Sequence, residues 1–170
     1  MTSRFVVAVL LIVGPLAPGR AAEVAMNDND NGVDHSDRHT GNDQAFAFGR
    51  RGDAENADRT IRLQALDTMR YSRSEFAVRA GETVRFIVTN AGKIRHELVI
   101  GDAAEHREHE QEMQRMHGME MHDEANGISL APGETKTIVW RFDGPGTVQL
   151  ACHEPGHYAA GMVSRVNVRR

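Results

Sequence analysis

One short segment, residues 151–162, combines a thiol, imidazoles and a thioether in the order Ala-Cys-His-Glu-Pro-Gly-His-Tyr-Ala-Ala-Gly-Met. Within it, Cys152, His157 and Met162 follow one another at intervals of five residues. One thiolate and two imidazoles in a plane, with a weak axial thioether, are the ligand set of electron-transfer copper. The segment therefore supplies three of the four ligands of such a site, and a second imidazole must come from elsewhere.

Cys152 is the single cysteine among the 170 residues, so it cannot form a disulfide within the chain. It is either a buried inert thiol, an intermolecular link or a thiolate held by a metal. Its histidine and methionine neighbours favour the metal.

His96 is the candidate for the missing imidazole. It follows the polar turn of residues 90–95 and opens the apolar run of residues 98–100. A buried histidine at the start of a strand can also simply satisfy a backbone group. A metal ligand needs its strand to lie beside the 151–162 segment.

Alternating apolar and polar residues begin near Thr60 and predict strands with one buried face. Turn signals at residues 80–82, 132–134 and 144–146 separate several of them. About eight short strands of this kind predict an all-β sandwich or barrel. The predicted strands lie near residues 61–65, 76–78, 84–88, 96–100, 128–130, 135–142, 147–152 and 162–168.

An insertion at residues 103–122 interrupts the β pattern. Its first part, residues 103–117, is free of Gly and Pro and rich in helix-favouring residues, so it predicts a short helix. In one interpretation its methionines cover the core and its histidines are solvated. In the other, its imidazoles and thioethers form a secondary Cu(I)-binding surface. The residues concerned are His106, His109, Met113, Met116, His117, Met119, Met121 and His122.

Residues 1–22 have the three parts of a signal peptide: a basic start, an apolar run and small residues at the end. We expect cleavage near Ala21 or Ala22. The apolar run is too short to span a bilayer comfortably, and a retained amphiphilic anchor is the alternative. Export implies an oxidising compartment, and we expect a periplasmic protein with no stable membrane anchor after cleavage.

Residues 23–59 are polar and lack apolar periodicity, which predicts a flexible arm before a domain at residues 60–170. We expect His35 and His39 in the arm to be solvated, and Phe46 and Phe48 to pack onto the domain. Removal of residues 1–22 would change the net charge from -4 to -6. Because the basic residues are scattered, the sequence gives no indication of nucleic-acid binding.

A histidine about 55 residues ahead of a Cys/His/Met segment resembles the arrangement in the cupredoxins, the plastocyanin and azurin family of blue copper proteins. The resemblance covers residues 60–168. It is strongest toward periplasmic copper-tolerance cupredoxins, which carry a His/Met-rich insertion after the first ligand strand. The matching segments are residues 81–86, 90–96, 132–134 and 152–162.

The resemblance implies a Greek-key β-sandwich with one type 1 copper site. The implied ligands are His96, Cys152, His157 and Met162. His153 is not among them, since neighbouring residues of a strand point to opposite sides. Many small blue copper proteins have Asn after the first histidine, where this chain has Glu97, so the surroundings of the ligands differ.

Three functions follow from these observations. The first is a copper-binding protein of copper tolerance or one-electron transfer, with a redox or copper-handling partner docking near His157 and Tyr158. The second is a plain respiratory electron carrier, which needs no His/Met insertion. The third is an enzyme, either a copper oxidase or a cysteine hydrolase; the first would need further histidine pairs, and the second would leave Met162 unexplained. Zinc is also possible, although a thioether is a poor ligand for it.

Overall fold

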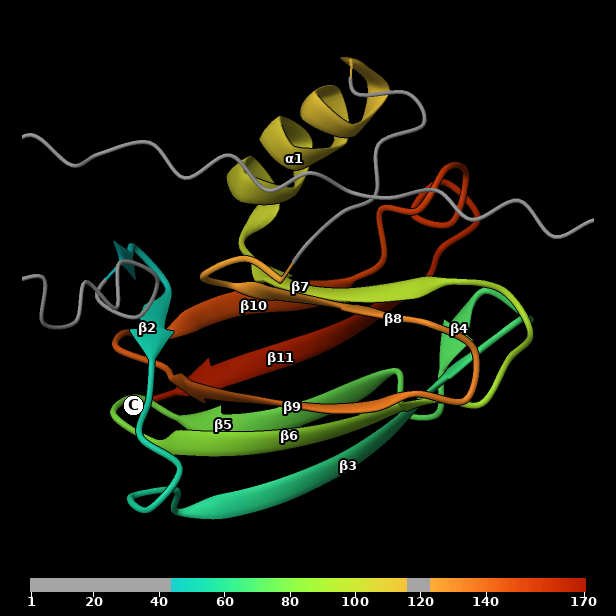
Figure 1. The fold of residues 1–170 in the computed structure, drawn as a ribbon. Coiled ribbons are helices and arrows are strands. Elements are labelled where there is room, and N and C mark those ends of the chain that lie inside the picture. The colour runs from blue at the N-terminus through green and yellow to red at the C-terminus, as the bar shows by residue number, and fades with distance from the viewer. Residues whose placement is uncertain (1–43, 116–122) are drawn as a thin grey trace, which may run out of the picture. The chain divides into compact units, whose positions relative to one another are not determined.

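The computed structural model describes residues 44–115 and 123–170, which form two packed β-sheets with one helix on the outside (Figure 1). The first sheet has the order β1-β2-β9-β6-β3-β4 and the second the order β5-β11-β10-β7-β8. In the first sheet the strands are β1 (Ala45–Phe46), β2 (Gly49–Arg51), β9 (Thr135–Arg141), β6 (Thr83–Asn90), β3 (Arg59–Leu66) and β4 (Arg70–Tyr71). In the second they are β5 (Glu75–Arg79), β11 (Val163–Arg169), β10 (Gly146–Ala151), β7 (His96–Gly101) and β8 (Gly127–Leu130).

The core lies between the two sheets, where the alternating apolar residues of the strands meet. In β3, for example, Ile61, Leu63 and Ala65 are buried while the residues between them are exposed. This is the period-two pattern on which the sequence prediction rests. Each of the eight predicted strands is present, and the prediction of a sandwich is confirmed. The largest fully buried side chains include Trp140, Phe86, Phe142, Leu63, Leu98, Ile100, Leu130, Ile138 and Leu150.

The sandwich begins earlier in the chain than residue 60. We expected a polar arm up to residue 59, but residues 45–51 form β1 and β2, and β2 pairs with β9. Phe48 is buried, and its ring stacks on Trp140 with 5.7 Å between centroids, as expected for an aromatic residue packing onto the domain. Periodicity could not find these strands, because a strand of two or three residues is too short to show alternation.

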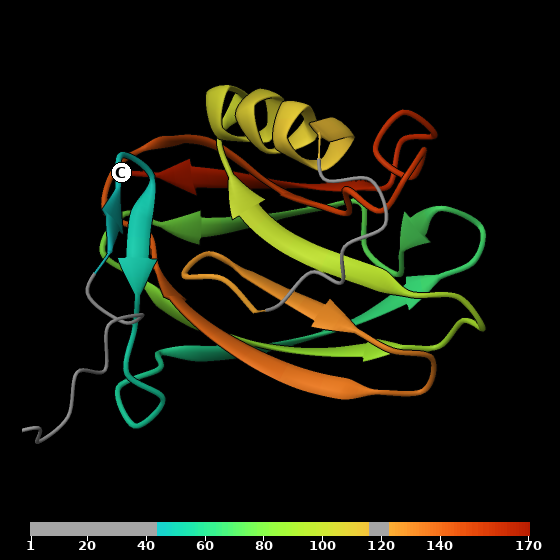
Figure 2. The same ribbon diagram turned by 45° about the horizontal axis from the view of Figure 1, so that its top comes forward.

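The helix α1 (Ala103–Arg115) begins at the predicted residue and follows β7 directly. Asp102 caps it: Oδ1 accepts the backbone N–H of Ala104 at 2.8 Å and of Glu105 at 3.0 Å. The helix lies over β7 and β10 on the outer face of the second sheet (Figures 1 and 2).

Several predictions concern residues outside the two described ranges. They are the signal peptide of residues 1–22, the greater part of the arm, and Met116, His117, Met119, Met121 and His122 of the insertion. Within the described ranges, no helix has both the length and the apolar character needed to cross a membrane.

Candidate metal centre

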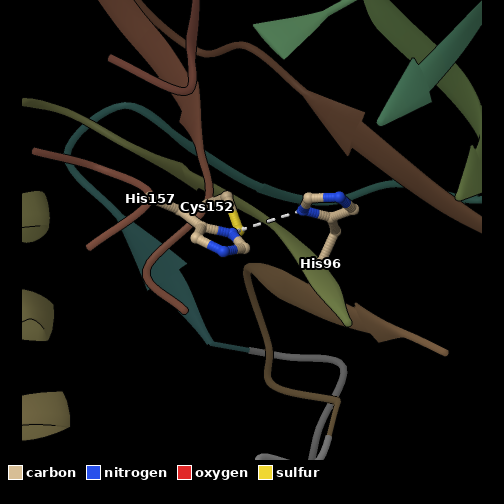
Figure 3. A group of neighbouring side chains, drawn as sticks. All are labelled: His96, Cys152 and His157. Carbon is tan, nitrogen blue, oxygen red and sulfur yellow. Dashed lines mark hydrogen bonds between the residues drawn. The ribbon is translucent and has the colours of Figure 1, made fainter. Parts of the chain in front are cut away.

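Three of the four predicted ligands meet at one end of the second sheet. His96 is the first residue of β7, Cys152 directly follows β10, and His157 lies in the loop between β10 and β11. β7 and β10 are antiparallel neighbours, with Val99 opposite Ala151. This pairing brings the start of β7 to the end of β10, and Figure 3 shows the three side chains pointing toward one another.

The ligand atoms of His96, Cys152 and His157 all lie within 4.8 Å of one another. Cys152 Sγ is 3.3 Å from His157 Nδ1 and 4.0 Å from His96 Nδ1. Metal–nitrogen bonds of about 2.0 Å and metal–sulfur bonds of about 2.3 Å, at trigonal angles, place nitrogen and sulfur about 3.8 Å apart. The three side chains therefore fit one metal ion between them.

Asp67 sets the orientation of the His96 ring. His96 Nε2 lies 3.2 Å from Asp67 Oδ1, and the other carboxylate oxygen accepts the backbone N–H of Lys93 at 2.8 Å. That backbone bond lowers the pKa of Asp67, so the carboxylate is the acceptor and His96 Nε2 carries the proton. Nδ1 of His96 is thereby left with a free lone pair directed at the site.

Cys152 is completely buried, and burial raises the pKa of its thiol to about 12. The backbone N–H of Glu97 donates to its sulfur at 3.3 Å. A thiol in this environment keeps its proton unless a metal cation replaces it. The environment suits a metal ligand and is unfavourable for a cysteine nucleophile.

Glu97 connects the two ligand-bearing segments. Its carboxylate accepts the backbone N–H of His153 at 3.3 Å, and its own backbone carbonyl accepts the hydroxyl of Tyr71. Burial, with Glu154 nearby, raises the pKa of Glu97 to about 7. Glu97, at the position where many small blue copper proteins have Asn, therefore joins the start of β7 to the segment after β10.

Met162 is fully buried at the far end of the ligand loop. Its N–H donates to the carbonyl of His157 at 3.0 Å, and its own carbonyl accepts the N–H of Cys152 at 3.2 Å. These two bonds close the loop on itself and hold the backbone of Met162 beside that of Cys152 and His157.

His157 is half-buried, whereas His96 and Cys152 are buried. Around it the loop exposes small residues, namely Pro155, Gly156, Ala159 and Ala160. Tyr158 turns inward instead: its ring stacks on His153 with 4.7 Å between centroids. The exposed surface nearest the metal centre is therefore made by small side chains.

The histidines of α1 are not solvated, which corrects one of our two interpretations of the insertion. His106 is completely buried and His109 is 6% exposed. Both rings pack against His153, which lies on the α1 side of the sheet and outside the group of three ligands. Met113 is half-buried.

Comparison with known proteins agrees with this geometry. The model of the family "Copper binding proteins, plastocyanin/azurin family" matches residues 59–169. The chain belongs to this family of copper-binding proteins. A copper-resistant cuproprotein, CopI of Rubrivivax gelatinosus, is 43% identical over 143 residues, which cover 82% of this chain and 86% of that protein. CopI of Pseudomonas aeruginosa is 35% identical, over 72% of this chain and 83% of that protein.

Solved structures show the same fold. A reduced auracyanin from Roseiflexus castenholzii superposes with a TM-score of 0.59 at 26% identity, over 67% of this chain and 99% of that one. Auracyanin A, a blue copper protein of Chloroflexus aurantiacus, gives a TM-score of 0.53 at 21% identity, over 65% and 98%. The fold is therefore that of the cupredoxins.

Sequence reasoning missed two residues of this region. Asp67 stands in a turn between β3 and β4 that carries no motif, and only the folded structure brings it to His96. His153 was set aside because it points away from the three ligands. That inference gave no indication of the histidines on the other side.

Proposed function

We propose that the chain is an exported cupredoxin of copper tolerance that holds one type 1 copper ion. The convergence of His96 Nδ1 and His157 Nδ1 on the sulfur of Cys152 carries this proposal. Met162 is the proposed axial ligand, because it closes the same loop. The copper-resistant cuproproteins to which the chain is similar support a role in tolerance.

Bound copper would supply one-electron redox chemistry. The protein's contribution is to hold the ligands in one arrangement for both oxidation states. Asp67 fixes the ring of His96, and the N–H of Glu97 points at the sulfur of Cys152. Burial of His96 and Cys152 keeps water away from two of the ligands. A site held in this way rearranges little when an electron arrives.

The exposed small residues around His157 favour electron exchange with a partner. The side chains exposed around the half-buried imidazole are small and protrude little; they belong to Pro155, Gly156, Ala159 and Ala160. We propose that a redox or copper-handling protein docks on this surface. The same surface also fits the second candidate function, a plain electron carrier.

We propose that the protein is not an enzyme and acts in the periplasm. A completely buried thiol with a pKa of about 12 is a poor nucleophile, which argues against a cysteine hydrolase. The likeness to copper-resistant cuproproteins and the three-part pattern of residues 1–22 support export.

The test is the visible spectrum of the purified protein with one equivalent of Cu(II). We expect an intense thiolate-to-copper band that is absent from Cys152→Ser. A wild-type protein without this band would overturn the proposed site. Copper tolerance is tested separately, by the growth of a deletion strain that carries either the wild-type or the Cys152→Ser gene in the presence of copper. Equal growth of the two strains would favour the plain carrier.

A further inference from the structure

A second group of histidines lies beneath α1, on the opposite side of the strand end from Cys152. It consists of His106 and His109 of α1 and His153 of the ligand loop, which are 0%, 6% and 2% exposed. The ring of His153 lies 5.1 Å from that of His106 and 4.7 Å from that of His109, between centroids. We call these three residues the histidine cluster.

In each of the three imidazoles, one ring nitrogen faces an acceptor outside the cluster. His106 Nε2 lies 3.3 Å from the carbonyl oxygen of Gln149, and His153 Nδ1 lies 2.8 Å from Glu110 Oε2. His109 Nδ1 lies 3.7 Å from Glu124 Oε2. A carbonyl and a carboxylate only accept, so these outer nitrogens of His106 and His153 carry the protons.

With these protons placed, the inner nitrogens of His106 and His153 have no proton to share. His106 Nδ1 and His153 Nε2 face each other at 2.9 Å, which in neutral rings sets two lone pairs against each other. His109 Nε2 is buried and has no hydrogen-bond partner among the residues that the structure describes. Burial lowers the pKa of His106 to about 4 and also lowers the pKa of His109.

We propose that the histidine cluster is a second metal site, which holds a copper ion between His106 Nδ1, His153 Nε2 and His109 Nε2. A cation at this point satisfies the facing lone pairs and the unpartnered nitrogen together. Histidine ligands of metals usually donate their other N–H to a carboxylate or a carbonyl, as His106 and His153 do. The site shares no ligand with His96, Cys152 and His157.

The rings must move to complete the site, because the nitrogens of His106, His109 and His153 do not all lie within 4.8 Å of one another in the described structure. Metal–nitrogen bonds of about 2.0 Å place two ligand nitrogens about 3.3 to 3.6 Å apart, so His106 and His153 must separate slightly from 2.9 Å. The His109 ring must turn toward them. These movements are available because His106 and His109 belong to a helix that covers the sheet from outside.

The donor set indicates the metal. Neutral imidazoles bind copper and zinc well, whereas hard ions such as Mg²⁺ and Ca²⁺ prefer oxygen ligands. Sites of nitrogen ligands generally bind Cu²⁺ more tightly than Zn²⁺. In a protein that binds copper at its first centre, copper is therefore the proposed occupant.

The experiment measures copper at the cluster separately from copper at the first centre. Full-length protein is titrated with Cu(II), and bound copper is followed by the thiolate band and by electron paramagnetic resonance. We expect a second equivalent that adds no thiolate band and shows nitrogen hyperfine splitting. His106→Gln and His153→Gln should lose this equivalent and keep the band, so the first centre reports that these variants fold.

Two further variants define the site. Glu110→Ala should weaken the second equivalent about 10- to 100-fold, because it removes the acceptor that orients His153. Joint replacement of Met116, His117, Met119, Met121 and His122 should leave the second equivalent in place. If that replacement abolishes it, or if His106→Gln binds as much copper as the wild type, the proposal is overturned. A cluster that takes up Zn(II) and excludes copper overturns the choice of metal.

Discussion

At the scale of single residues, the interaction between His96 and Asp67 decides which ring nitrogen faces the metal centre. The carboxylate accepts from Nε2 at 3.2 Å, so Nδ1 faces the candidate metal centre. Acceptors of this kind orient a ligand ring and raise its basicity.

Replacing Asp67 should weaken metal binding without unfolding the protein. Asp67→Ala removes the acceptor of His96 Nε2–H, and we expect copper affinity to fall about 10- to 100-fold. Asp67→Asn keeps an acceptor oxygen and should lose less. Affinity is measured by competition with a chelator, and the tautomer of His96 in the metal-free protein by NMR. Glu55→Ala, at an exposed position, controls for the change of charge. If Asp67→Ala and Glu55→Ala show equal affinities, Asp67 does not position His96.

Gly92 leaves the space that the Asp67 carboxylate occupies, because a Cβ atom at this position would lie 1.8 Å from Asp67 Oδ1. Gly92→Ala should displace the Asp67 carboxylate and so reproduce the loss of affinity of Asp67→Ala. The double variant should lose no more than either single variant, since both remove one interaction. Gly144→Ala is the matched control, as nothing lies within 4 Å of its Cβ position. Additive losses in the double variant would show that Gly92 acts by another route.

At the scale of elements, β2 belongs to the sandwich although the surrounding sequence is polar. Gly49 makes this possible: its φ is +141°, and a Cβ atom would lie 2.1 Å from the carbonyl oxygen of Arg141. Only glycine allows β2 to pass so close to β9. The aromatic side chain of Phe48 then covers Trp140.

Truncation of Phe48 should show that β2 contributes to stability. We expect Phe48→Ala to lower the free energy of unfolding by about 3 kcal/mol, because it removes a buried ring from Trp140. Ile94→Ala, at a position that is 41% exposed, should change it by less than about 0.5 kcal/mol. Chemical denaturation of the metal-free proteins measures both. Equal stability of the two variants would mean that residues 45–51 do not support the sandwich.

At the scale of the whole domain, Arg51 joins the two sheets at the place where the chain returns from the insertion. Its guanidinium donates to the carbonyl oxygens of Glu124 and Ala125, at 2.6 Å each. These residues immediately precede β8, and the side chain of Glu124 faces His109. One arginine of the first sheet therefore holds the segment that borders the histidine cluster.

Arg51→Lys should loosen this segment while the sandwich stays folded. A lysine cannot reproduce the planar, multiple donors of arginine. We therefore expect the free energy of opening this segment to fall by about 1 to 3 kcal/mol. Hydrogen exchange should quicken at Gly127 and Ile128 more than in β6. Arg62→Lys, on the exposed side of β3, is the control. If Arg51→Lys and Arg62→Lys show the same hydrogen exchange at Gly127 and Ile128, Arg51 does not hold the segment.

The sequence by itself determined eight of the strands, the helix start and the candidate copper-binding segment. Buried faces of strands leave a period-two pattern, and residues such as Cys152, His157 and Met162 stand close together in the chain. Patterns of this kind are local, so they can be read without coordinates. The position of His96 at the start of a strand was also visible.

Only the tertiary structure decided what lies across from these residues. Asp67 is 29 positions from His96, and His106 is 47 positions from His153, so neither pair leaves a local pattern. Both contacts arise because strands and a helix that are distant in sequence pack together. One of our two interpretations of the insertion left the histidines of α1 solvated. Their burial against His153 depends on the packing of α1 over β7 and β10, which the sequence does not encode at any single position.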